Sequence, residues 1–185
     1  MCHGVTPIQS RTRTHLIVQL HIPTLTTERL VLVPPDPSHL AAYLAAYGDA
    51  EVMAHIAEPM DANKVWDMMA RQIGHWAMRG FGGWSVQLRN GGAIIGRLGL
   101  MRPGDNPDVE IGWVLGRESW GKGYATEGAH AALSFGFDVL GAKRIVAHIL
   151  PGNAGSISVA TKLGMRLDAA RSAAEANIYV ADCPA

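Results

Sequence analysis

Residues 120–127, with the sequence Trp-Gly-Lys-Gly-Tyr-Ala-Thr-Glu, constrain the fold of this chain more than any other segment. They follow an apolar, strand-like run that ends at Leu115 and precede an amphipathic, helix-like stretch that reaches Leu140. Two glycines at such a junction let the backbone turn tightly, with its N–H groups free to point at an anion. The positive end of the following helix dipole faces the same spot. The segment therefore predicts a site for a phosphate-bearing ligand.

The composition is that of one globular domain. The chain has 185 residues, of which 48% are hydrophobic and 17% charged, so it can bury a sizeable core and is not a disordered chain. Its 16 basic and 16 acidic residues give a formal net charge of zero, which argues against broad nucleic-acid binding. Cys2 and Cys183 form no metal or redox motif, which favours a reducing, cytoplasmic setting. No apolar run approaches the length of a membrane span, so no membrane partner is expected.

The order of the predicted elements indicates a mixed α/β fold. Residues 1–22 are expected to form an irregular extension, and residues 23–185 a single domain. Apolar periodicity and turn residues predict strands and helices in the order strand, two helices, three antiparallel strands, helix, strand, helix and one or two terminal strands. This order implies a largely antiparallel sheet, not the βαβ alternation of a doubly wound fold. The predicted strands cover 30–33, 84–88, 93–100, 109–115 and 145–150, and the predicted helices cover 37–48, 62–80, 124–141 and 154–163.

Two common phosphate motifs match the glycine segment only in part. Residues 116–123 follow the P-loop pattern G-x-x-x-x-G-K-[ST], but Gly123 replaces the hydroxyl residue that binds Mg²⁺. Residues 121–126 begin like the dinucleotide pattern G-x-G-x-x-G, but Thr126 stands in its last position and no short βαβ unit carries it. A nucleotide triphosphatase and a dinucleotide-binding domain are therefore disfavoured.

A third motif extends beyond the loop. The strand, the x-x-x-Gly-x-Gly loop and the helix resemble the pyrophosphate-binding motif of the GNAT acyltransferase superfamily, in particular its RimJ/RimL branch of N-acetyltransferases. Residues 25–32 are similar to the first strand of that branch, and residues 153–165 resemble its last helix. The matched pieces occur in family order and cover about residues 24–168. The resemblance implies the GNAT fold, with a mostly antiparallel twisted sheet flanked by helices, and transfer of an acetyl group from acetyl-CoA to a primary amine in a ternary complex, without a metal.

The resemblance also implies which residues contact the cofactor. The backbone amides of the glycine segment would bind the CoA pyrophosphate, and the strand before it would supply the donor for the reaction's oxyanion near Trp113 or Val114. Glu118 departs from the family, which usually has Gln or Arg there, and Val33 replaces a common arginine. The expected contacts are Trp113, Val114, Trp120, Gly121, Lys122, Gly123, Tyr124, Ala125, Thr126, Asn153 and Ser156.

Two residues are candidates for the chemistry. Glu110 lies on the predicted strand before the loop, where a carboxylate resembles the base of several GNAT enzymes, acting directly or through water. The same carboxylate would also suit acceptor binding or a solvent-facing position. Ser156 occupies a place where the RimJ/RimL branch often has serine, and the resemblance implies that it hydrogen-bonds the CoA sulfur. With Asn153 it also suits the cap of a helix. Ala160 stands where many GNAT enzymes carry a tyrosine acid.

The sequence leaves the acceptor and the assembly open. The acceptor is either a protein N-terminal α-amine or a small-molecule amine, and a homodimer is compatible with the chain. A non-catalytic acyl-CoA-binding module remains the alternative, because Ala160 and Glu118 both depart from the family pattern. His130 and His148 lack metal-binding spacing and are expected to be structural. His148 is also a candidate site residue, because its strand would border the cofactor cleft.

Overall fold

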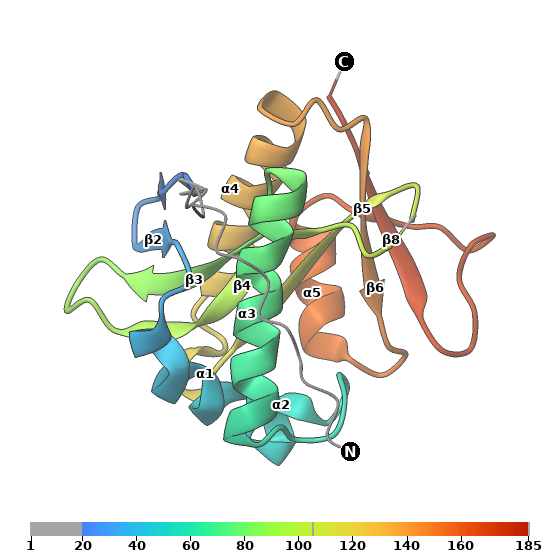
Figure 1. Ribbon diagram of the computed structural model, residues 1–185. Coiled ribbons are helices and arrows are strands. Elements are labelled where there is room, and N and C mark those ends of the chain that lie inside the picture. The colour runs from blue at the N-terminus through green and yellow to red at the C-terminus, as the bar shows by residue number, and fades with distance from the viewer. Residues whose placement is uncertain (1–19, 105, 185) are drawn as a thin grey trace, which may run out of the picture.

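A sheet of eight strands forms the centre of the molecule, in the order β1-β2-β3-β4-β5-β6-β8-β7 (Figure 1). The computed structural model describes residues 20–104 and 106–184. All neighbouring strands are antiparallel except β5 and β6, which confirms the predicted mixed α/β fold with a largely antiparallel sheet. The strands are β1 (Leu25–Thr26), β2 (Leu30–Val33), β3 (Gly83–Leu88), β4 (Ile94–Met101), β5 (Val109–Leu115), β6 (Arg144–Ile149), β7 (Arg166–Leu167) and β8 (Asn177–Asp182).

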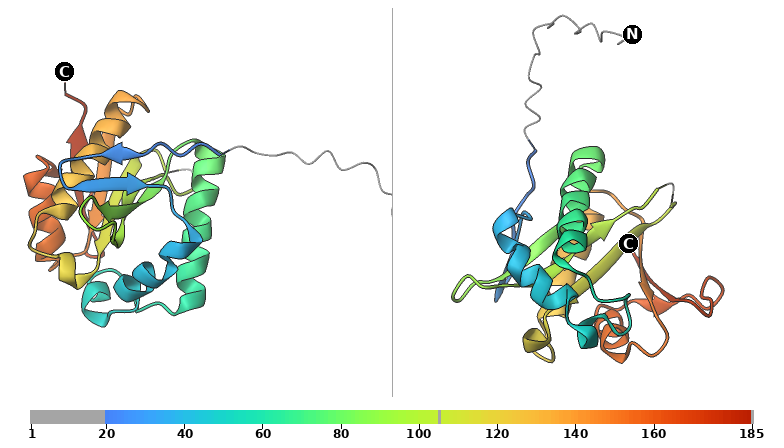
Figure 2. Two further views of the ribbon diagram at one scale, coloured as in Figure 1. Left: turned by 90° about the vertical axis from the view of Figure 1, so that its left-hand side faces the viewer. Right: turned by 60° about the horizontal axis from the view of Figure 1, so that its bottom comes forward.

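Helices cover both faces of the sheet. The left view of Figure 2 shows α3 and α4 on opposite sides of it. One face carries α1, α2 and α3, and the other carries α4 and α5, so the sheet is buried in the middle. The helices are α1 (Leu40–Tyr47), α2 (Ala50–Met53), α3 (Ala62–Arg79), α4 (Tyr124–Asp138) and α5 (Ala154–Lys162), with short 3₁₀ turns η1 (Pro37–His39) and η2 (Arg117–Ser119).

Local capping explains most of the helix bounds. The Asp61 side chain accepts a hydrogen bond from the Lys64 amide at the start of α3, and Gly80 ends the helix with a left-handed φ of 74°. The sequence analysis missed α2, a four-residue helix that the Asp49 side chain caps. It also extended α4 too far, because the helix ends at Asp138 and not near Gly141.

Two hydrophobic clusters fill the space between the layers. The larger one packs sheet residues against α4 and α5, and it includes the edge-to-face pair of Trp84 and Phe135, whose ring centroids lie 5.3 Å apart. The smaller cluster lies under α1, α2 and α3. The helix over 62–80 was predicted from an apolar stripe at three- and four-residue spacing, made of Val65, Met68, Met69, Ile73, Trp76 and Ala77. The cluster holds Val65, Met68 and Met69, whereas Ala77 is exposed.

Close packing of α4 on the sheet fixes the position of its N-terminus. A Cβ atom on Gly128 would lie only 2.4 Å from Leu98 Cδ2 and 3.4 Å from Leu30 Cδ1. Glycine therefore lets the first turns of α4 approach β2 and β4 more closely than any other residue would.

β5 and β6 separate after a short parallel contact. They pair only at Val109 with Ile145 and at Glu110 with Val146, although β5 continues to Leu115 and β6 to Ile149. The side of β5 that faces β6 therefore has no strand partner beyond Glu110. The separation lies beside Trp113 and Val114, where the family resemblance implied the oxyanion donor.

Candidate functional site

The glycine segment joins β5 to α4 with its amide groups unpaired. Gly121 and Gly123 have left-handed φ values of 70° and 80°, and Gly123 caps α4 without any side-chain hydrogen bond. The first backbone bond of the helix runs from the Glu127 amide to the Gly123 carbonyl. Within the described part of the chain, no amide of residues 121–126 donates to a protein acceptor. This run of free donors at a helix N-terminus suits a phosphate group.

A cavity of about 560 Å³ lies against these amides. Its walls come from the glycine segment, the end of β5, the start of α5, and α2 with the turn that follows it. Of the eleven residues expected to contact the cofactor, all but Lys122 line it. Those ten are Trp113, Val114, Trp120, Gly121, Gly123, Tyr124, Ala125, Thr126, Asn153 and Ser156. Lys122 is exposed. Its backbone carbonyl oxygen accepts a hydrogen bond from Arg29 in the loop.

The sequence analysis missed the wall that α2 contributes. Glu51, Val52 and the turn through Ile56 line the cavity, but this short element carries no periodicity that would single it out. Arg117 of η2 donates to Glu51 Oε2 over 2.6 Å, which ties α2 to the segment that follows β5. Glu118, the acidic departure from the family pattern, is exposed and does not line the cavity. The Glu118 carboxylate therefore lies outside the cavity in which a phosphate would bind, and it need not repel that phosphate.

The first strand segment holds the glycine loop in place through Glu127. Thr27 Oγ1 donates to Glu127 Oε1 over 2.6 Å, and Arg29 Nε donates to Oε2 over 2.6 Å. Arg29 Nη1 also donates to the Lys122 carbonyl, and its guanidinium lies 4.8 Å from the centre of the Tyr124 ring. These contacts join residues almost a hundred positions apart. Thr27 and Arg29, from the segment that resembles the first strand of the family, therefore help to position the loop.

Replacing Glu127 with glutamine is expected to lower the midpoint of urea unfolding at pH 7. Partial burial acts to raise the pKa of Glu127, but the hydrogen bonds from Thr27 and Arg29 outweigh it and hold the pKa below its usual value of 4.5. A carboxylate with a lowered pKa stabilises the folded state above its unfolded pKa and loses that effect as the pH falls through its folded pKa. The difference between wild type and Glu127→Gln should therefore shrink as the pH falls below 4.5.

The exposed carboxylate Glu118, which forms no hydrogen bond with another described residue, offers the matched control. Urea titrations of Glu118→Gln should follow wild type at every pH. A Glu127→Gln difference that stays constant from pH 7 to pH 3 would show that the contact is not an ionic one.

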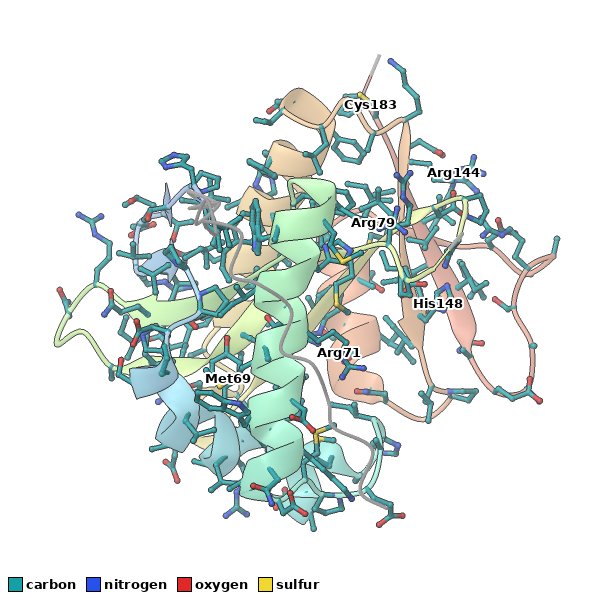
Figure 3. All side chains as sticks on the ribbon, viewed as in Figure 1. Met69, Arg71, Arg79, Arg144, His148 and Cys183 are labelled. Atoms are coloured by element: carbon teal, nitrogen blue, oxygen red, sulfur yellow. The ribbon has the colours of Figure 1, made fainter. Side chains whose placement is uncertain are left out.

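Glu110 of β5 lies beside His148 of β6. Figure 3 labels His148, which lies on the side of the sheet that faces the viewer, as α3 does. Asn106 Nδ2 donates to Glu110 Oε1 over 2.7 Å, and His148 Nε2 lies 3.9 Å from the same oxygen. The Glu110 side chain is 21% exposed and that of His148 is 41% exposed, so water reaches both. His148 was expected to be structural, with a place in the site as the alternative because its strand borders the cofactor cleft. It lies beside the candidate base.

A second cavity of about 220 Å³ lies where β5 and β6 have separated. His148, Arg97 and Gly112 line it, whereas Glu110 lines neither cavity. The two cavities share six lining residues, so they meet at the gap between the strands. The shared residues are His55, Ile56, Trp113, Val114, Asn153 and Ser156.

Asn153 and Ser156 stand at this junction, where the structure shows their role in capping α5. Asn153 Oδ1 accepts from the Ser156 amide over 3.0 Å, so Asn153 does cap α5. The Ser156 hydroxyl forms no hydrogen bond with any other described residue and is therefore available to a ligand. Ala160 is fully buried and brings no acid to the site.

Two further observations concern the chain as described, residues 20–104 and 106–184. No group of three or more His, Cys, Asp or Glu side chains there is arranged to hold a metal ion. No helix in this part is long and apolar enough to cross a membrane. His130, the other lone histidine, is exposed on α4.

Comparison with known proteins identifies the family. The family model described as Acetyltransferase (GNAT) domain matches residues 29–166. An uncharacterized protein, YkkB, of Bacillus subtilis is 32% identical over 149 residues, covering 76% of this chain and 84% of its own. An uncharacterized N-acetyltransferase, p20, of Bacillus licheniformis is 31% identical over 147 residues, covering 77% and 82%. The crystal structure of an acetyltransferase from Agrobacterium tumefaciens aligns with a TM-score of 0.79 at 31% identity, over 87% of this chain and 95% of that one. The chain therefore belongs to the GNAT acetyltransferase family.

Proposed function

We propose that the protein is an N-acetyltransferase that moves an acetyl group from acetyl-CoA to a primary amine. The observation that carries this proposal is the run of unpaired amides at residues 121–126 beside a cavity of about 560 Å³. The amides and the α4 dipole would bind the CoA pyrophosphate. The cavity leads along β5 to the gap between β5 and β6, where a thioester would meet an acceptor in the smaller cavity.

The residues at this gap suit direct attack in a ternary complex. The amine nitrogen must be neutral to form its bond to the thioester carbonyl carbon, so its proton must leave. Glu110 accepts that proton, directly or through water, with His148 beside it at 3.9 Å. Breaking the carbon–sulfur bond then releases CoA as a thiolate, which takes up a proton from solvent beside the free Ser156 hydroxyl.

The backbone of β5 would stabilise the oxyanion formed on the way. Beyond Glu110 this strand has a partner only on its β4 side, and Trp113 and Val114 line both cavities at the gap. An unpaired amide here can donate to the carbonyl oxygen as negative charge develops on it, with little reorganisation of the protein.

Several finer assignments rest on the sequence. They are the RimJ/RimL branch, the single domain over 23–185, the cytoplasmic location and a homodimer. Most of the extension predicted over 1–22 lies outside the described residues, but Leu20 and Ile22 pack against the larger hydrophobic cluster.

Calorimetric titration with acetyl-CoA, followed by thiol release with a panel of primary amines, tests the function. We expect saturable binding of acetyl-CoA and turnover with at least one amine. Binding without turnover across amino acids, polyamines and N-terminal peptides would instead support the non-catalytic acyl-CoA-binding module. Absence of acetyl-CoA binding would refute both.

A further inference from the structure

We propose that the amine acceptor is a small molecule with an anionic group, a carboxylate or a phosphate, and that this group binds the guanidinium of Arg97. The inference rests on the proposed function, because it takes the smaller cavity as the acceptor site. It adds the chemical class of the acceptor, which neither the fold nor the family relationship determines.

Arg97 lies in the middle of β4, under α1. It pairs with Ser85 of β3 on one side and with Val114 of β5 on the other, and it lines the smaller cavity. Its Nε atom donates to Tyr47 Oη over 2.5 Å, which fixes the side chain. Its Nη1 atom is buried without any hydrogen-bond partner. A guanidinium presents five donors in a planar fork, so most of its capacity here is unused.

No described residue neutralises the charge of Arg97. Among the described residues, no carboxylate forms an ion pair with it. Its polar neighbours are hydroxyl groups, and burial raises the pKa of Tyr43 to about 12, so that phenol stays neutral. Arg97 is half-buried and its Nη1 atom is fully buried. A charge withdrawn from water without an anionic partner is costly, and proteins generally supply a partner for it. A ligand is the partner that this cavity can still admit.

The rest of the cavity fits the same class of ligand. His148 and His55 are the other titratable residues in its lining, and no acidic residue lines it. Its remaining walls are mostly apolar, and its volume of about 220 Å³ suits a small molecule. The candidate base Glu110 lies beside His148, outside the lining. A ligand whose anion sits on Arg97 would therefore extend its amine toward His148 and the gap at β5.

The test compares matched acceptors that differ only in the anion. Suitable pairs are an α-amino acid with its amide, an amino acid with the amine left by loss of its carboxylate, and 2-aminoethyl phosphate with ethanolamine. For wild type we expect kcat/KM to be about 100-fold higher for the anionic member of at least one pair, since a charge-assisted bidentate contact contributes about this much. The carboxylate and phosphate pairs separate the two sources of the anion.

Variants of Arg97 show whether this residue binds the anionic group of the acceptor. Arg97→Met keeps the length of the side chain without its charge, and should reduce the anionic-to-neutral ratio to near one. Arg97→Lys keeps the charge without the fork, and should give an intermediate ratio. Arg89→Met is the matched control, because the hydrogen bonds of the Arg89 side chain to described residues go to the backbone carbonyls of residues 27 and 28, and Arg89 lines neither cavity. Its ratio should equal that of wild type.

Each outcome bears on one proposal. If neutral amines are acetylated and no anionic acceptor is preferred, the acceptor class is wrong while the acetyltransferase function stands. An unchanged ratio in Arg97→Met, with wild-type affinity for acetyl-CoA, would remove Arg97 as the anion-binding residue. If the Arg97 variants do not fold, the wild-type ratio alone decides. If no amine is acetylated, the proposed function itself fails.

Discussion

Replacing Gly123 with valine is expected to weaken acetyl-CoA binding about 100-fold. Gly123 has a φ of 80°, which a β-branched residue adopts only with strain, so the loop must change its conformation. A Cβ atom there would also lie 3.3 Å from Arg29 Nη2, within the contacts that position the loop. Losing one or two charge-assisted bonds to the pyrophosphate costs about 3 kcal/mol, which is roughly a hundredfold in the dissociation constant. Isothermal titration calorimetry measures the dissociation constant of acetyl-CoA directly.

Gly141→Val is the matched control for backbone strain. Gly141 has a φ of 65°, a Cβ atom there would meet no other atom within 4 Å, and the residue follows the other end of α4. Both substitutions should lower the stability of the fold by about 1–2 kcal/mol, because both force a left-handed backbone on valine. Only Gly123→Val should lose affinity. Equal binding by the two variants would place the pyrophosphate elsewhere.

Glu110→Gln is expected to reduce kcat about 100-fold while leaving the dissociation constant of acetyl-CoA unchanged. A positioned general base contributes about 10²–10⁴ to rate, and glutamine cannot accept the amine's proton. Its side-chain carbonyl can still accept the hydrogen bond from Asn106, so the local structure should persist. Glu110 does not line the larger cavity, which is why affinity for acetyl-CoA should be preserved. Steady-state kinetics with the preferred amine and calorimetry measure the two effects.

Two further variants make the assignment of the base specific. Glu175→Gln changes an exposed carboxylate on the loop before β8 and should keep wild-type kcat. His148→Gln removes the imidazole 3.9 Å from Glu110. If the large loss of kcat appears in His148→Gln and not in Glu110→Gln, the histidine is the base and the carboxylate only orients it.

Local signals in the sequence predicted the elements that depend on local physics. The cap at Asp61 and the left-handed Gly80 bound α3 where the pattern placed it, because capping and glycine conformation need no tertiary contact. The pattern failed for α2, whose four residues are too few to show periodicity, and for Ala77, whose side of α3 turns to solvent. The first error comes from the shortness of the element, and the second concerns packing, which a single segment cannot report.

The cofactor half of the candidate site was largely visible in the sequence. Residues 121–126 present unpaired backbone amides, so two glycines followed by a helix are sufficient to predict a phosphate site, and their neighbours on the chain do line the cavity. Only the tertiary structure decided the acceptor half. The acceptor half depends on where β5 separates from β6. Near this separation Glu110 lies beside His148, and the smaller cavity opens next to Arg97. These three residues come from three different strands and share no sequence pattern. Backbone conformation is encoded locally, whereas a side chain left without a partner is known only once every neighbour is in place.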